Sequence, residues 1–186
     1  MAELQPVIGP PDNKPYRIAP LIRTTLLLLY LSLVGPLPVL APPELRVWLL
    51  AALMLGLVLV LAMLSEQVVL ESDAIRVGHP RWCAWLFRRG WRLDWSEVGR
   101  LVPITTSQGG TVHYIRSRQG EHFLLPQRLE RFADFLMRFQ QSTGLDTRGI
   151  GRITPAWTYW TLAMLSLLLL IGEGISFAWL LPAQAG

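Results

Sequence analysis

Lysine and cysteine are almost absent from this chain. Its 186 residues contain 17 Lys and Arg, of which only Lys14 is a lysine, and a single cysteine, Cys83. One cysteine excludes a disulfide within the chain and the paired-cysteine spacing of a zinc site. Cys83 stands between Trp82 and Trp85, so we expect it to behave as a small apolar residue.

The sequence also lacks the short motifs of common enzyme classes. It has no P-loop, no dinucleotide-binding glycine pattern, no HExxH helix and no nucleophile elbow. A hairpin turning at residues 119–120 would place Ser117 opposite His122, so His113 and His122 would not be direct partners. We expect these imidazoles, and that of His79, to be surface or core residues. The sequence therefore predicts no catalytic residues, no metal and no cofactor, in a protein that is not an enzyme.

Charge is missing from three long apolar stretches, residues 24–41, 47–64 and 156–181, with Glu173 the one acidic residue inside them. A helix that crosses a bilayer needs about 20 largely apolar residues. The stretches therefore predict three transmembrane helices. We divide the chain into a polar tail (1–20), a helical hairpin (21–64), a polar domain (65–153), a third helix (154–181) and a short tail (182–186). About twenty polar residues precede the first stretch, which favours a retained anchor over a cleaved signal.

The positive charges lie on one side of this layout. Sixteen of the 17 cations either precede the first apolar stretch at residue 24 or fall in the polar domain, and Arg46 alone lies in the turn between the first two helices. The positive-inside rule then places the tail and the domain in the cytoplasm, or in its equivalent in an internal membrane system.

Prolines indicate where the helices break and begin. Gly35 to Pro38 should kink or end the first helix, and Pro42 to Glu44 should form a tight return. Thr154 and Pro155 suit the start of the third helix, as N-cap and first helical residue.

The polar domain is predicted to be mostly strand followed by one helix. Short β-type runs lie at 68–70, 75–77, 91–95, 112–115 and 122–125. Apolar residues at helical spacing then indicate an amphipathic helix over residues 128–141 that closes the sheet, with Gly144 ending it.

The segments "GWRLDWSEVGRLVPI", "HYIRSRQGEHFLLP" and "LERFADFLMRFQQSTGL", in that order, resemble the pleckstrin-homology-like (PH-like) domain of membrane-anchored bacterial proteins. The resemblance covers about 75 residues. It implies an α+β membrane protein in which a PH-like β-sheet or barrel, closed by one helix, is inserted between the second and third transmembrane helices. Two helices followed by such a domain are also similar to the photosystem I assembly factors of cyanobacteria and plastids, with an extra C-terminal helix here. That similarity implies scaffolding, in an inner or thylakoid membrane.

One segment of the domain alternates arginine with tryptophan. Indole rings favour the membrane interface and guanidinium groups bind phosphate, so the segment suits contact with anionic headgroups or with a partner protein. The alternative is an ordinary strand pair whose tryptophans fill the core. Nucleic acid is not expected, because the tether keeps the segment at the membrane. The candidate contact residues are Arg81, Trp82, Trp85, Arg88, Arg89, Trp91 and Arg92.

Glu173 is an ionisable residue inside the third apolar stretch, flanked by Gly172 and Gly174. Such a group usually faces protein or water. It could contact a partner subunit, a pigment or a proton path. Alternatively, its carboxyl reaches the interface, stays protonated or pairs with Arg46.

The sequence favours a scaffold or assembly factor for a larger membrane complex, with a photosynthetic complex as one candidate. The alternative is an accessory or regulatory subunit of a membrane transporter, protease or secretion system.

Overall fold

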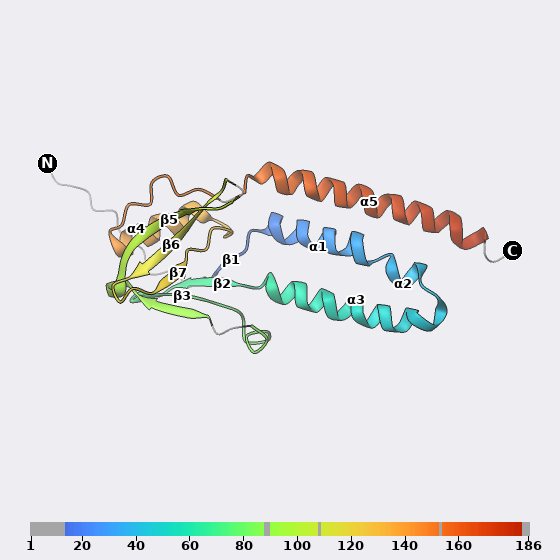
Figure 1. The fold of residues 1–186 in the computed structure, drawn as a ribbon, viewed down its shortest axis with the longest axis horizontal. Helices are drawn as coiled ribbons and strands as arrows, with labels where there is room; N and C mark the ends of the chain where they lie inside the picture. Colours follow the sequence, from blue (N-terminus) through green and yellow to red (C-terminus); the bar gives the residue numbers. More distant parts are fainter. Residues whose placement is uncertain (1–13, 88–89, 108, 153, 184–186) are drawn as a thin grey trace. The chain divides into compact units, whose positions relative to one another are not determined.

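The computed structural model describes residues 14–87, 90–107, 109–152 and 154–183, and it divides the chain into two compact units (Figure 1). Residues 18–65 and 154–186 form a helical unit, and residues 1–17 and 66–153 form an α+β unit. Along the chain, residues 66–153 thus lie between the two parts of the helical unit.

The helical unit contains α1 (Pro20–Val34), α2 (Leu37–Leu40), α3 (Pro43–Met63) and α5 (Ala156–Ala183). Three spans are long and apolar enough to cross a membrane: Pro20–Leu40, Pro43–Met63 and Ala156–Trp179. The three predicted apolar helices are therefore confirmed. The break expected in the first of them is present, because α1 ends at Val34 and α2 begins after Pro36.

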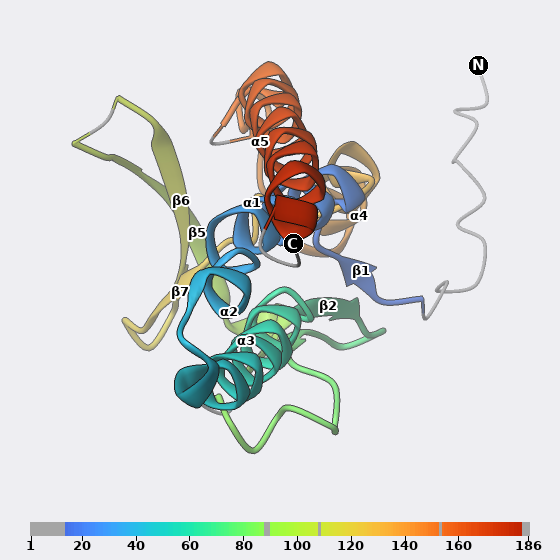
Figure 2. The ribbon, with the colours of Figure 1, turned by 90° about the vertical axis from the view of Figure 1, so that its right-hand side faces the viewer.

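In the helical unit α1 lies between α3 and α5 (Figure 2). Small and hydroxyl-bearing residues join α1 to both neighbours. The Thr25 hydroxyl donates to the carbonyl of Leu21 at 2.8 Å and lies 3.2 Å from that of Tyr159 on α5. On the α3 side, the Tyr30 hydroxyl donates to the Leu53 carbonyl at 2.7 Å. A Cβ at Gly56 would lie against that hydroxyl oxygen, so the glycine makes room for the tyrosine.

The α+β unit has two antiparallel sheets. One contains β1 (Tyr16–Arg17), β2 (Gln67–Leu70), β3 (Ala74–Gly78) and β4 (Trp91–Asp94), in that order. A short 3-10 helix, η1 (Trp95–Glu97), leads to the other sheet, β5 (Val98–Thr105), β6 (Thr111–Ser117) and β7 (His122–Leu124). Within the described residues no strand joins the two sheets, so the barrel implied by the PH-like resemblance is not closed.

One amphipathic helix, α4 (Phe132–Thr143), covers the core between the sheets. It begins four residues later than predicted, because residues 128–131 approach it in a loop that includes Arg131 at a positive φ of 47°. Gly144 ends it in the left-handed conformation, as predicted, and its N–H bonds the Gln140 carbonyl. The largest side chains buried in this core, two of them on α4 itself, are Val68, Ile75, Ile115, Leu125, Leu129, Phe135 and Phe139.

The N-terminal segment extends the first sheet. Tyr16 and Arg17, which the sequence analysis assigned to a polar tail, pair with Val68 and Gln67. Tyr16 is buried, and its ring meets that of Phe135 edge-on at 5.7 Å. A two-residue strand after a polar stretch has no periodicity, so the sequence carried no signal for it.

Candidate functional site

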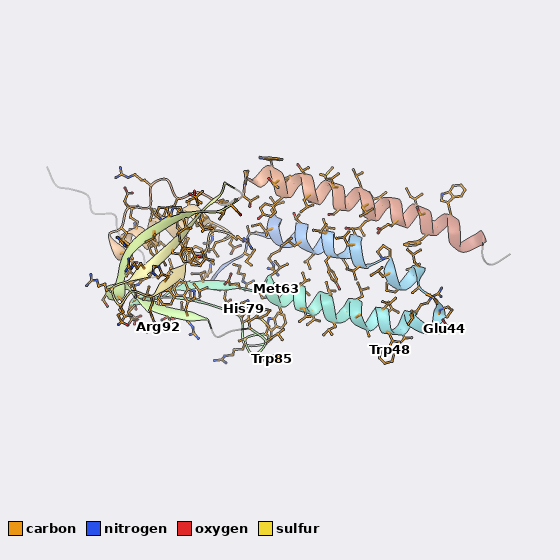
Figure 3. All side chains as sticks on the ribbon, in the orientation of Figure 1. Glu44, Trp48, Met63, His79, Trp85 and Arg92 are labelled. Atoms are coloured by element: carbon orange, nitrogen blue, oxygen red, sulfur yellow. The ribbon has the colours of Figure 1, made fainter. Side chains whose placement is uncertain are left out.

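The connection from β3 to β4 presents tryptophan to solvent. We call residues 79–87 the tryptophan loop. Trp82 and Trp85 have exposed fractions of 52% and 80%, and Leu86 is 41% exposed. Figure 3 labels Trp85 on this loop. Soluble surfaces rarely place several large apolar side chains together without a role in contact. The loop is therefore the first candidate for a contact surface.

The exposure of these tryptophans follows from a hydrogen-bonded turn in the loop. The Pro80 carbonyl accepts hydrogen bonds from the N–H groups of Cys83 and Ala84, and the Leu86 N–H donates to the Cys83 carbonyl. This helical winding directs Cys83 inward, where it is 1% exposed, as the sequence predicted for a small apolar residue. The Trp85 indole N–H donates to the Trp82 backbone carbonyl at 3.0 Å, which fixes the Trp85 ring relative to the backbone of the loop.

The ends of the loop are held close together. The rings of His79 and Phe87 stack with centroids 4.4 Å apart and planes 16° from parallel. At the neck, a Cβ on Gly90 would lie 2.0 Å from the Val77 carbonyl oxygen and 2.7 Å from the Gly78 Cα. Only glycine fits there, so the two strands approach closely enough to close the loop at its base.

The strand register shows at which end of the sheet this loop lies. Gln67 pairs with Arg17 on one side and with Gly78 on the other. Arg17 is the last residue of β1 before the chain continues toward α1, and Gln67 is the first residue of β2 after α3. Two of the three connections to the helical unit, from β1 to α1 and from α3 to β2, therefore leave from the end of the sheet that carries the tryptophan loop.

A groove of about 810 Å³ runs over the outer face of the same sheet and beside the loop. Its floor is formed by alternate residues of β2, β3 and β4, which point away from the core. It is lined by Gln67, Val69, Glu71, Arg76, Val77, Gly78, His79, Pro80, Arg81, Ala84, Gly90, Trp91 and Arg92.

Three carboxylates surround one of the lining arginines. Arg92 lies 3.3 Å from Glu71, 2.6 Å from Asp73 and 2.8 Å from Asp94, measured from guanidinium nitrogen to carboxylate oxygen. The hydrogen bond to Glu71, with the charges of Asp94 and Asp73, raises the pKa of Arg92. Its charge is thus compensated within the sheet.

The candidate contact residues divide into three groups. Arg81, Trp82 and Trp85 are exposed together on the loop. Trp91 packs against Phe123, with ring centroids 4.9 Å apart, and so contributes to the core rather than to an open contact surface. Arg92 is exposed but pairs with its own carboxylates, whereas Arg88 and Arg89 lie outside the described residues.

Glu173 and Arg46 are not paired with each other. Glu173 is half-buried on α5, and among the described residues it forms neither an ion pair nor a hydrogen bond. Arg46, exposed on α3, donates from Nε to the Ala41 carbonyl at 3.1 Å. The alternative in which these two residues neutralise one another is therefore not the arrangement seen.

A buried polar contact near the start of β6 had no signal in the sequence. The Gln127 side-chain oxygen accepts from the His113 backbone N–H at 3.3 Å, and its amide donates to the Gly151 carbonyl at 2.8 Å. It thereby fixes the chain that leads to α5. Burial lowers the pKa of His113, which favours a neutral imidazole. His122 lies on the exposed side of β7, opposite Arg116 rather than the expected Ser117.

The part of the chain that the structure describes holds no group of three or more His, Cys, Asp or Glu side chains arranged to bind a metal ion.

Comparison with known proteins identifies a cyanobacterial relative. The uncharacterized protein slr0269 of Synechocystis sp. (strain ATCC 27184 / PCC 6803 / Kazusa) is 39% identical over 160 residues, which cover 83% of this chain and 80% of that protein. The chain belongs to the family of this protein. No protein-family model matches the chain, and no solved structure matches it.

The shared region is too long to lie within the α+β unit alone, so the relationship includes apolar helices as well. The name of that relative states no activity. The PH-like resemblance and the expected assembly role therefore stay predictions.

Proposed function

We propose that this protein is a non-enzymatic membrane scaffold, which serves as an assembly factor for a larger membrane complex. In this proposal the three apolar helices cross the bilayer and the α+β unit lies on the cytoplasmic side. The tryptophan loop rests in the headgroup region of the adjacent leaflet. The rest of the unit is then presented to partner proteins at a fixed orientation.

The observation that carries the proposal is the place of the exposed tryptophans. Trp82 and Trp85 lie on the loop at the end of the sheet from which two of the three connections to the helical unit leave. Two residues separate β1 from α1, and three separate α3 from β2. At about 3.3–3.6 Å per extended residue, these connections reach only about 10 Å. A loop at this end of the sheet is therefore well placed for the membrane–water interface, where tryptophan is favoured.

Removal of the protein tests the assembly role. In a deletion strain of the source organism, native-gel separation of membrane complexes should reveal one complex that is depleted while its subunits are still synthesised. Wild-type protein should restore that complex. The double variant Trp82→Ala/Trp85→Ala should restore it poorly, because its domain has lost the interfacial contact.

A matched control is the double variant Leu31→Ala/Leu33→Ala, which also removes two exposed apolar side chains but from α1. It should restore the complex if the loop is specifically required. Unchanged membrane complexes in the deletion strain would contradict the assembly role.

A second candidate function, an accessory subunit of a membrane transporter or protease, is favoured by Glu173. A half-buried carboxyl without a partner among the described residues suits contact with another membrane protein. An accessory subunit should co-purify with the mature complex in fixed stoichiometry, and Glu173→Gln should reduce that recovery. An assembly factor should instead associate with precursors and be absent from the mature complex.

A further inference from the structure

The groove beside the tryptophan loop carries positive charge that its own sheet does not neutralise. Arg76 and Arg81 are exposed, and neither forms an ion pair with any residue that the structure describes. Arg92, by contrast, is paired with Glu71, the acidic residue of the lining. An anion entering the groove would therefore meet two unpaired guanidinium groups, while the nearby carboxylate is already compensated.

The shape of the groove suits a headgroup-sized ligand. The Arg76 position lies in the middle of the row formed by Val69, Arg76 and Arg92 across three strands. Toward the loop this row gives way to Gly78 and Gly90, whose missing side chains leave bare backbone on the floor. His79 lies at the same end, with its ring fixed by stacking on Phe87 and a nitrogen that can donate a hydrogen bond.

We propose that this groove binds the phosphate of an anionic phospholipid headgroup between Arg76 and Arg81. Guanidinium groups bind phosphate oxygens in bidentate fashion, which single point charges do not. The choice of a lipid over a free anion rests on the proposed function, because the groove opens beside the loop expected to lie at the interface. The groove would then give the domain a preference for membranes that contain this anionic lipid.

Short-chain lipids test this site on the full-length protein in detergent. Dioctanoyl phosphatidylglycerol is titrated while thermal unfolding is monitored, with dioctanoyl phosphatidylcholine as the zwitterionic control. The anionic lipid should raise the unfolding temperature in a saturable manner, and the zwitterionic lipid should raise it much less. Arg76→Gln/Arg81→Gln should lower the affinity of the protein for the anionic lipid about tenfold or more, because two charge-assisted contacts are lost.

The matched control is Arg100→Gln/Arg118→Gln, which removes the same charge from exposed positions on β5 and in the turn after β6. It should change the affinity less than about twofold. An equal loss of lipid affinity in both double variants would show that the lipid is held by general electrostatic attraction, and it would overturn the proposal. If Arg76→Gln prevents folding, Arg81→Gln alone should still weaken binding, because Arg81 lies on the loop rather than in a strand.

The source of the phosphate is distinguished by two further titrations. Inorganic phosphate that competes at the same concentration as the lipid would identify an anion site and overturn the assignment to a lipid. A poly-glutamate peptide that binds through the same two arginines, without binding of the lipid, would identify an acidic protein partner and overturn it as well.

This test is independent of whether the loop enters a bilayer. Trp82→Ala/Trp85→Ala should bind the short-chain lipid with wild-type affinity, since the phosphate contacts come from the groove. Failure of the groove proposal and failure of the interfacial proposal therefore give different results.

Discussion

The Tyr16 hydroxyl donates a hydrogen bond of 2.5 Å to Oδ2 of Asp134, a residue 118 positions later in the chain. The Arg131 guanidinium lies over the Tyr16 ring, 5.1 Å from its centroid, and Arg138 pairs with Asp134 one turn along α4. This contact fastens β1 to α4 immediately before the chain enters α1. The first apolar helix is thus attached to the α+β unit by a strand that belongs to the core.

Tyr16→Phe should destabilise the full-length protein by about 1.5–3 kcal/mol, the usual contribution of a buried hydrogen bond to a charged group. The ring and its packing on Phe135 are retained in this variant, so the loss reports the hydroxyl. Denaturant unfolding of the purified protein in detergent measures the change. Tyr114→Phe, on the half-buried face of β6, should have little effect. Equal stability of wild type and Tyr16→Phe would contradict this account of the contact.

The same contact should make stability depend on pH at both extremes. The hydrogen bond from Tyr16 lowers the pKa of Asp134, so the stabilisation is complete above its ordinary pKa of 3.8 and is lost as pH falls through the lowered value. Burial raises the pKa of Tyr16 to about 12 from an ordinary 10.0, so its contribution is present below pH 10 and is lost as pH rises through about 12. Unfolding midpoints of Tyr16→Phe measured across pH should flatten on both limbs relative to wild type.

Gly90→Ala should disrupt the neck of the tryptophan loop. The added Cβ would meet the Val77 carbonyl and the Gly78 Cα, which are backbone atoms that cannot move without shifting a strand. Overpacking of this kind costs about 1–3 kcal/mol. Gly151→Ala is the control, because nothing lies within 4 Å of the Cβ it would add. Thermal unfolding should separate the two variants, and identical midpoints would show that the strands at the neck can move apart freely.

The proposed orientation predicts where the C-terminus lies. With three crossing helices and a cytoplasmic domain, a cysteine introduced by Gly186→Cys in a Cys83→Ala background should react with a membrane-impermeant maleimide from the non-cytoplasmic side. The physical basis is that 16 of the 17 cations either precede the first apolar stretch or lie in the polar domain. Reaction from the cytoplasmic side alone would exclude a three-helix layout with this orientation.

Much of the helical unit could be predicted from sequence, because the length and polarity of an apolar run are local properties. The break at Gly35 and Pro36, and the return at Pro42, follow from the missing N–H of proline. The sheet order depends instead on pairing between distant segments. Whether the strands close into a barrel is decided by register, which the alternating patterns do not encode. The two separate sheets therefore differ from the closed barrel that the resemblance allowed.

The candidate contact residues illustrate the same limit. Trp85 and Trp91 are six residues apart in an alternating segment, yet one is exposed and the other packs on Phe123. The first part of this segment forms the turn after Pro80, and only the structure places that turn. Arg92 could not be separated from Arg81 either, because its partners Glu71 and Asp73 come from 19–21 residues earlier through the β3–β4 pairing.

The most direct test of the central claim is the depth of the tryptophan loop in a bilayer. The full-length Cys83→Ala protein, reconstituted in lipid nanodiscs, is labelled with a small fluorophore at Leu86→Cys on the loop or at Ser72→Cys in the β2–β3 turn, at the opposite end of the sheet. Nitroxide-bearing lipids should quench the label at position 86 strongly and the label at position 72 weakly. Equal and weak quenching at both positions would contradict the interfacial placement of the loop.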